Sequence, residues 1–291
     1  MSPSEEARDR ITATRPLCAL VTGASSGIGK AFAELLAERG HDVVLVARRE
    51  ELMTEIAEDI EARFTSKATV IPADLSDPSA PATLVAKVEE QNIEVDVLVN
   101  NAGYTMDGHF LSYEWEEHRA YQQVMCLTPA ELTYRFLPGM LRRGFGQVIN
   151  VASVAGLMPS TPFNALYGPS KQHMITLTRT LQIEYGKAGL TFSVVCPGPV
   201  SETSIIETQH GAAWARFGFL LSDTREVAEK AYAAVEKGKT LQVVGPSTRA
   251  VSTIGRLVPT DTWSKAAAGG IMFLGKEKPI KSAEAAGIEP E

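Results

Sequence analysis

The 291-residue chain has few cysteines, no run of basic residues and no long apolar stretch. Its three cysteines are widely spaced and lack a Cys-x-x-Cys pair, so the sequence predicts neither a disulfide framework nor a zinc site and fits a reducing compartment. The net charge of −7 disfavours nucleic acid as a partner, because phosphate-binding proteins usually carry a basic face. The longest late apolar stretch, 266–274, is about half of the roughly 20 residues that a spanning helix needs. We therefore expect a cytoplasmic protein with no transmembrane segment.

The two ends of the chain differ in composition from the part between them. Residues 1–15 mix acidic and basic side chains with no apolar segment, so they do not resemble a secretory signal, and we expect a mobile extension. Residues 276–291 are rich in charge, Ala, Pro and Gly, which predicts a disordered tail. No repeat or linker divides the rest. We expect one domain over residues 16–275, with a substrate lid at about 199–222 and an apolar extension at about 252–275.

Short apolar runs alternate with segments of helical periodicity in this domain. We expect strands at 17–22, 43–47, 68–71, 95–99, 147–151, 192–196 and 241–244. We expect helices around 28–39 and at 51–64, 82–90, 115–141, 168–185 and 224–237, the last with Asp223 as its cap. Such strands are buried on both faces, and crossovers that contain helices require parallel pairing. The fold class is therefore α/β, a Rossmann-like doubly wound parallel sheet of about seven strands with helices on both faces.

A glycine-rich segment joins the first strand to the first helix. It reads Thr22-Gly23-Ala24-Ser25-Ser26-Gly27-Ile28-Gly29. Glycines allow a tight turn and close backbone approach, and the helix N-terminus offers unpaired N–H groups to a pyrophosphate. A turn that only caps the strand is the alternative, but a dinucleotide site requires this position between a strand and an amphipathic helix. The spacing Gly-x-x-x-Gly-x-Gly resembles the signature of the short-chain dehydrogenase/reductase family.

Two arginines, Arg48 and Arg49, follow the second strand. An NAD site usually has a carboxylate here for the ribose 2′-hydroxyl, whereas an arginine suits the 2′-phosphate of NADP. The sequence favours NADP(H), with Arg48 as the phosphate ligand. A solvated basic pair that opens a helix is the alternative.

Four further segments occur in the order that the family has them: Asp74-Leu75, Asn100-Asn101-Ala102-Gly103, Ser153 and Tyr167-Gly-Pro-Ser-Lys171. The resemblance covers residues 17–203. It implies that Asp74 and Leu75 border the adenine and that Asn101, Ala102 and Gly103 line the cofactor channel. It also implies that Pro197, Gly198 and Val200 lie beside the nicotinamide, where either Ser201 or Thr203 contacts the carboxamide.

The reactive residues are Ser153, Tyr167 and Lys171. When hydride reduces a ketone, the oxygen must gain a proton, which Tyr167 can donate. Lys171 lies one helical turn after Tyr167, so its charge can lower the phenol's pKa, and it can reach the cofactor ribose. Ser153 can polarise the carbonyl oxygen. These residues predict an NADP(H)-dependent carbonyl reductase or alcohol dehydrogenase.

Two departures from the family pattern concern the proton relay and the pocket wall. Cys126 matches the position of a relay asparagine, and a thiol lacks the paired donor and acceptor of an amide. The relay is rerouted, Gln122 or Gln123 serves instead, or Cys126 is a small buried hydrophobe. Slightly more residues than is common also separate Ser153 from Tyr167 in the sequence, and the loop between them can accommodate the extra length.

The substrate is expected to be an apolar ketone or alcohol, because the segment 199–222 carries several aromatic and aliphatic side chains. These side chains pack as core or as a subunit contact in the alternative interpretation. We expect a homodimer or homotetramer. The histidines lack metal-ligand spacing, so no metal is expected. The rival functions are a cofactor-binding regulatory or scaffold protein with impaired turnover, and an epimerase or dehydratase, which the short C-terminal region disfavours.

Overall fold

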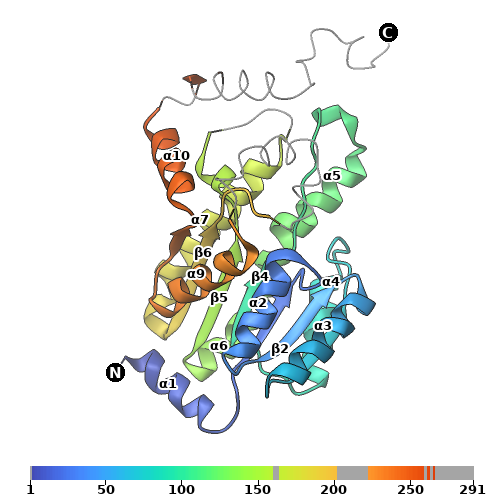
Figure 1. Ribbon diagram of the computed structural model, residues 1–291, viewed down its shortest axis with the longest axis vertical. Helices are drawn as coiled ribbons and strands as arrows, with labels where there is room; N and C mark the ends of the chain where they lie inside the picture. Colours follow the sequence, from blue (N-terminus) through green and yellow to red (C-terminus); the bar gives the residue numbers. More distant parts are fainter. Residues whose placement is uncertain (1, 160–163, 202–221, 259–260, 263–264, 266–291) are drawn as a thin grey trace.

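Seven parallel strands form one sheet in the computed structural model, in the order β3-β2-β1-β4-β5-β6-β7 (Figure 1). Their bounds are β1 Cys18–Thr22, β2 Asp42–Ala47, β3 Ala68–Pro72, β4 Val97–Asn100, β5 Gly146–Val151, β6 Leu190–Cys196 and β7 Leu241–Val243. The structure describes residues 2–159, 164–201, 222–258, 261–262 and 265. This sheet confirms the predicted Rossmann-like α/β class.

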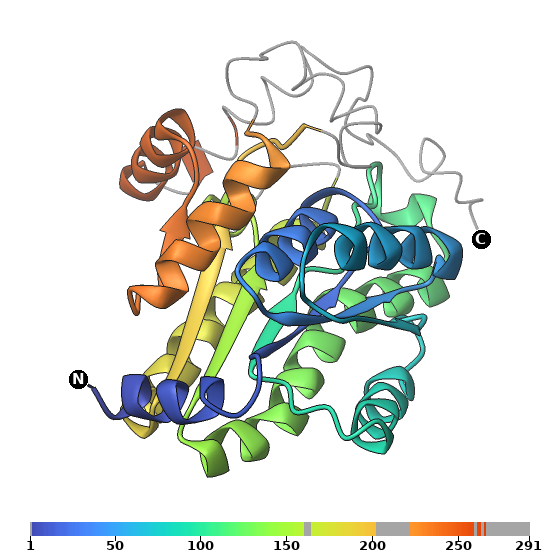
Figure 2. The ribbon, with the colours of Figure 1, turned by 60° about the horizontal axis from the view of Figure 1, so that its bottom comes forward.

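Helices cover both faces of the sheet (Figure 2). On one face lie α2 Gly27–Glu38, α3 Glu50–Arg63 and α9 Thr224–Glu236, whose apolar side chains share one buried cluster with the strands. On the other face lie α4 Ala80–Glu90, α6 Thr128–Arg143 and α7 Tyr167–Tyr185. The strands read as continuous Val/Leu/Ile runs because both of their faces are covered in this way.

The strand order reverses between β1 and β4, which pair in parallel through Ala19–Val97, Leu20–Leu98 and Val21–Val99. β2 lies on the other side of β1 and β5 on the other side of β4. The chain after β1 leads to α2 on one face of the sheet, whereas the chain after β4 leads to α6 on the other face. In doubly wound sheets, ligands bind at this switch point, outside the carboxyl ends of the strands.

The segment predicted as one helix over 115–141 consists of three parts. These are α5 Trp115–Gln122, the π-helical turn η2 Gln123–Leu127 and α6. Pro129 accounts for the interruption, because it lacks the N–H that would bond to the carbonyl four residues earlier, and its ring crowds that carbonyl. Wide π turns inside helices often occur at functional sites. This one includes Cys126.

Two helices lie where the sequence analysis expected none. Within the predicted N-terminal extension, α1 Pro3–Thr12 is a helix whose first turn is closed by a capping box between Ser2 and Glu5. Ala7 is buried against Leu17 and Phe145, so the helix has an apolar contact with the rest of the chain. The mixed charges of residues 1–15 gave no sign of this contact. At the other end of the described chain, α10 Pro246–Leu257 follows β7.

Most of the predicted substrate lid, much of the apolar extension and the whole predicted tail lie outside the described residues. The described ends of the lid segment meet in a short parallel bridge between Val200 and Ser222. Within the part of the chain that the structure describes, no helix is long and apolar enough to cross a membrane.

Candidate functional site

The glycine-rich loop between β1 and α2 packs directly against the loop after β4. Gly23 has a φ of +67°, and a Cβ there would lie 2.9 Å from Nδ2 of Asn101. A Cβ on Gly29 would lie 2.2 Å from the carbonyl oxygen of Gly23. The backbone can take this path only without side chains at these positions. The N-terminus of α2 begins at Gly27, and Ser26 at its N-cap makes no side-chain capping bond, so the first N–H groups of this helix are available to an anion.

Thr22 and Asn101 join the two loops at the switch point. The Thr22 hydroxyl accepts hydrogen bonds from the backbone N–H groups of Asn101, at 2.9 Å, and Ala102, at 3.1 Å. The Asn101 amide donates to the Thr22 carbonyl at 2.9 Å. Beyond it, a Cβ on Gly103 would lie 3.7 Å from Nζ of Lys171. The predicted channel residues Asn101, Ala102 and Gly103 thus lie between the glycine-rich loop and Lys171.

Both arginines after β2 are exposed, but they have different partners. The Arg49 guanidinium donates to the Ser25 hydroxyl at 2.8 Å and to the Ser26 hydroxyl at 2.8 Å. The Arg48 charge acts on Asp74 and lowers the pKa of that carboxyl, after the larger effect of hydrogen bonds from Ser76. Arg48 was the predicted phosphate ligand, whereas Arg49, its neighbour in the sequence, is the arginine that contacts the glycine-rich loop.

Asp74 and Leu75 follow β3 on the same side of the switch point. The Asp74 carboxylate accepts hydrogen bonds from the backbone N–H and the hydroxyl of Ser76, at 3.0 and 2.8 Å. Leu75 is buried, and its carbonyl accepts a hydrogen bond from Thr128 at 3.0 Å. Asp74 is therefore fixed in place close to Arg48.

Ser153, Tyr167 and Lys171 come together at the carboxyl ends of β5 and β6. Ser153 follows β5 and forms a hydrogen bond with Tyr167, while Lys171 lies one turn into α7. Its Nζ is 5.7 Å from the centre of the Tyr167 ring and donates to the Val151 carbonyl at 3.0 Å. Lys171 is 5% exposed. The fold thus assembles the three side chains that the sequence spacing predicted on two separate elements.

The electrostatics of this cluster differ from the expectation. Burial raises the pKa of Tyr167, the hydrogen bond with Ser153 lowers it, and the charges of Asp107 and Cys196 raise it further. We expected Lys171 to lower it, but burial also lowers the pKa of Lys171, to about 8. The net shift of Tyr167 is upward because the loss of water around the phenol outweighs the stabilisation of the phenolate.

The π turn places Cys126 close to Lys171, whose charge lowers the pKa of the thiol against a larger rise from burial. Cys126 is partly exposed. Gln123 is buried and its amide donates to Thr128 at 3.2 Å. The hydroxyl of Tyr121 lies near Ser170, Tyr167 and Cys126, and each of these three residues affects the pKa of Tyr121. Sequence reasoning did not identify this buried tyrosine.

The segment after β6 lies beside the serine. The Pro197 carbonyl accepts a hydrogen bond from the Val154 N–H at 2.9 Å, and Val200 is buried. A Cβ on Gly198 would lie 2.5 Å from the hydroxyl of Thr248 at the start of α10. Thr203 lies outside the described residues. Ser201 is described, and its hydroxyl donates to the Ser222 carbonyl at 3.3 Å.

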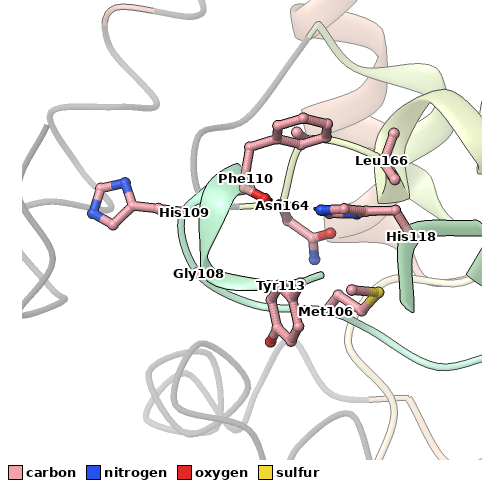
Figure 3. Close-up of a pocket in the computed structure, with 9 residues that line it drawn as sticks. Met106, Gly108, His109, Phe110, Tyr113, His118, Asn164 and Leu166 are labelled. Carbon is pink, nitrogen blue, oxygen red and sulfur yellow. Dashed lines mark hydrogen bonds between the residues drawn. The ribbon is translucent and has the colours of Figure 1, made fainter. Parts of the chain in front are cut away.

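A small hollow adjoins the residues that lead into Tyr167 (Figure 3). It has a volume of about 250 Å³, solvent at its mouth included, and is lined by Met106, Gly108, His109, Phe110, Tyr113, His118, Asn164, Ala165 and Leu166. The His118 ring stacks on Phe110 with centroids 4.5 Å apart and bonds to the Phe110 carbonyl at 2.8 Å. Figure 3 shows His109 pointing away from the other labelled side chains. The side chains that line the hollow are mainly apolar and aromatic.

Comparison with known proteins agrees with this geometry. The family model for short chain dehydrogenase matches residues 17–212. The chain is 33% identical over 248 residues to a ketoacyl reductase, HetN, from Nostoc sp., covering 83% of this chain and 85% of that protein. It is 29% identical over 226 residues to a 7beta-hydroxysteroid dehydrogenase from Mediterraneibacter gnavus, covering 77% and 84%.

A solved structure from a study of 7beta-hydroxysteroid dehydrogenase stereoselectivity has the same fold, with a TM-score of 0.79 at 24% identity over 86% of this chain and 96% of that one. The family match spans the glycine-rich loop, the segment after β4 and the cluster of Ser153, Tyr167 and Lys171. The chain is an oxidoreductase that belongs to the short-chain dehydrogenase/reductase family.

Proposed function

We propose that this protein is an NADP(H)-dependent carbonyl reductase or alcohol dehydrogenase that acts on an apolar ketone or secondary alcohol. The observation that carries the proposal is the meeting of Ser153, Tyr167 and Lys171 at the carboxyl ends of β5 and β6. The channel residues after β4 connect this cluster to the glycine-rich loop. A hydride carrier and a proton donor can then reach the same carbonyl group.

Tyr167 transfers the proton in this proposal. In the reductive direction its hydroxyl donates to the carbonyl oxygen as hydride reaches the carbon, and in the oxidative direction it takes the proton back. Ser153, hydrogen-bonded to Tyr167, stabilises the negative charge that develops on the substrate oxygen. Lys171 holds the cofactor ribose, and its ammonium stabilises the phenolate that forms when Tyr167 gives up its proton.

The residues after β2 fit a 2′-phosphate better than a 2′-hydroxyl. Arg48 and Arg49 occupy the place where an NAD site has a carboxylate, and Arg49 already spans the Ser25 and Ser26 hydroxyls. The Asp74 carboxylate is bonded to Ser76. Arginine binds phosphate oxygens through two parallel N–H groups. The bound nicotinamide supplies or accepts the hydride, and the residues of this chain hold it and manage the proton.

The apolar substrate class is supported by the hollow beside Leu166. Its lining is mainly aliphatic and aromatic, with Asn164 as a polar group. The two relatives are named for ketoacyl and hydroxysteroid chemistry, and these names accord with a carbonyl or alcohol substrate that has a large apolar part.

The test compares NADPH and NADH consumption with a panel of apolar ketones. Tyr167→Phe is expected to abolish turnover while NADPH binding persists. Arg48→Ala and Arg49→Ala are each expected to raise the KM for NADPH roughly tenfold to a hundredfold and to leave the KM for NADH nearly unchanged. Arg63→Ala, an exposed arginine paired with Asp59 on α3, is the control. Equal rates in wild type and Tyr167→Phe would refute the mechanism, and an NADH preference that survives both arginine changes would refute the cofactor assignment.

A further inference from the structure

A side-chain pair, Asp107 and Asn164, joins the loop after β4 to the residues that precede Tyr167. Asn164 donates a hydrogen bond through Nδ2 to Oδ1 of Asp107 at 3.0 Å. The Asn164 carbonyl then accepts a hydrogen bond from the Tyr167 backbone N–H at 3.3 Å. Asp107, Asn164 and Tyr167 thus form a continuous chain of contacts. Asp107 belongs to no motif that the sequence analysis identified.

The position of Asp107 is itself fixed. The Tyr113 hydroxyl donates to the Asp107 carbonyl at 2.9 Å, and Asp107 is partly buried. Figure 3 shows the Asn164 side chain in the centre of the hollow, with its amide directed toward the Tyr113 and Met106 side. A carboxylate held in this way cannot turn freely into solvent, so its charge stays beside the site.

We propose that Asp107 is a positioning residue for the reaction. It orients the start of α7 through Asn164, and its negative charge near the Tyr167 phenol destabilises the phenolate. This inference rests on the proposed role of Tyr167 as the proton donor. It deepens that role, because a carboxylate near the phenol destabilises the phenolate and so sets how readily Tyr167 gives up the proton and takes it back.

The charge of Asp107 raises the pKa of the Tyr167 phenol, as expected for a carboxylate near a group that becomes negative when it loses its proton. The other polar and titratable groups around Tyr167 come from four elements. They are Ser153 after β5, Cys196 at the end of β6, Tyr121 on α5 and Lys171 on α7. Among the groups whose effects on the Tyr167 pKa are resolved, Asp107 is the carboxylate. Its removal therefore has a distinct electrostatic signature.

The test is a spectroscopic titration of Tyr167 with and without bound NADP⁺. The ultraviolet absorbance of tyrosinate is followed against pH, and the same titration of Tyr167→Phe is subtracted. Asp107→Asn keeps the shape and an acceptor oxygen but removes the charge, so the Tyr167 midpoint is expected to fall by about half a pH unit to one unit. Asp107→Glu restores the charge and is expected to keep the midpoint near that of wild type.

Two further variants separate the electrostatic effect from a structural one. Asn164→Ala breaks the bond to Asp107 but keeps its charge, so it is expected to lower kcat for ketone reduction roughly tenfold while the midpoint shifts less than in Asp107→Asn. Asp77→Asn removes an exposed carboxylate that bonds to Ser79, and it is expected to change neither quantity. Urea unfolding checks that each variant is folded.

An unchanged Tyr167 midpoint in folded Asp107→Asn would overturn the proposal, and so would the same midpoint shift in Asp107→Asn and Asn164→Ala. Failure of the proposed function looks different. In that case wild type shows no Tyr167-dependent reduction of any ketone in the panel, although the titration still reports whether Asp107 acts on the phenol.

Discussion

Replacement of Lys171 by methionine is expected to abolish reduction and yet to stabilise the fold near neutral pH. Lys171 is 5% exposed, and burial lowers its pKa from 10.5 to about 8. At about 1.4 kcal/mol per pH unit, this shift means that the charged ammonium destabilises the folded state by about 3 kcal/mol. Methionine has a similar length and no charge, so it removes this effect.

A second interaction opposes the gain. Lys171 donates to the Val151 carbonyl at 3.0 Å, and a buried carbonyl that loses its donor costs about 1 to 3 kcal/mol. The difference leaves a rise in the free energy of unfolding of roughly 1 kcal/mol for Lys171→Met at pH 7. A residue retained at such a cost to stability is typical of a functional site.

The pH dependence distinguishes this mechanism from a packing effect. Because the folded pKa lies below the unfolded one, the unfolded chain binds more protons between about pH 8 and 10.5. Wild type therefore gains about 1.4 kcal/mol per pH unit across that window relative to Lys171→Met, and the advantage of the variant shrinks and then reverses. Below about pH 8 both states hold the proton, and the difference is constant.

Urea unfolding followed by circular dichroism from pH 7 to 9.5 measures the effect. The exposed Lys187 on η4 Gly186–Ala188 provides a matched control, since Lys187→Met is expected to show a difference from wild type that does not vary with pH. A difference between Lys171→Met and wild type that stays flat over the whole range would refute the reasoning, because it would mean that burial does not disfavour the ammonium.

Three further predictions concern the fold and the glycine-rich loop. His41, buried with Nε2 2.7 Å from the Tyr232 hydroxyl, has its pKa lowered from 6.5 to about 4 by burial. As the pH falls from 6.5 toward 4, the free energy of unfolding of wild type is expected to fall by up to about 3 kcal/mol more than that of the His41→Gln variant. Urea unfolding measures both, and parallel pH profiles would contradict this prediction. Asp96 is fully buried and paired with Arg15 at 2.6 Å, so Asp96→Ala is expected to lower the free energy of unfolding by about 3 to 5 kcal/mol, whereas a change within error would show that the pair is dispensable. Gly29→Ala places a Cβ 2.2 Å from a backbone carbonyl and is expected to weaken NADPH binding measured by calorimetry at least tenfold; wild-type affinity would argue against the loop as the phosphate site.

The fold class and most of the element bounds were readable from the sequence because they depend on local patterns. The Val/Leu/Ile runs that became β1, β2 and β4 are buried on both faces, and their unbroken apolar character reflects that burial. The glycine-rich loop was readable for the same reason, since its glycines are required by close backbone approach within one short segment. The capped helix α1 was missed because its few apolar contacts come from distant residues.

The sequence alone determined the parallel sheet, the glycine-rich loop and the candidate trio Ser153, Tyr167 and Lys171, since side chains one helical turn apart or at the end of a strand are placed by local geometry. Only the tertiary structure decided the environment of that trio. In the folded chain Asn164 connects Asp107 to Tyr167, and Arg49 is hydrogen-bonded to a serine of the glycine-rich loop. Lys171 is buried, which lowers its pKa. Burial and long-range charge depend on residues far apart in the chain, and no local pattern encodes them.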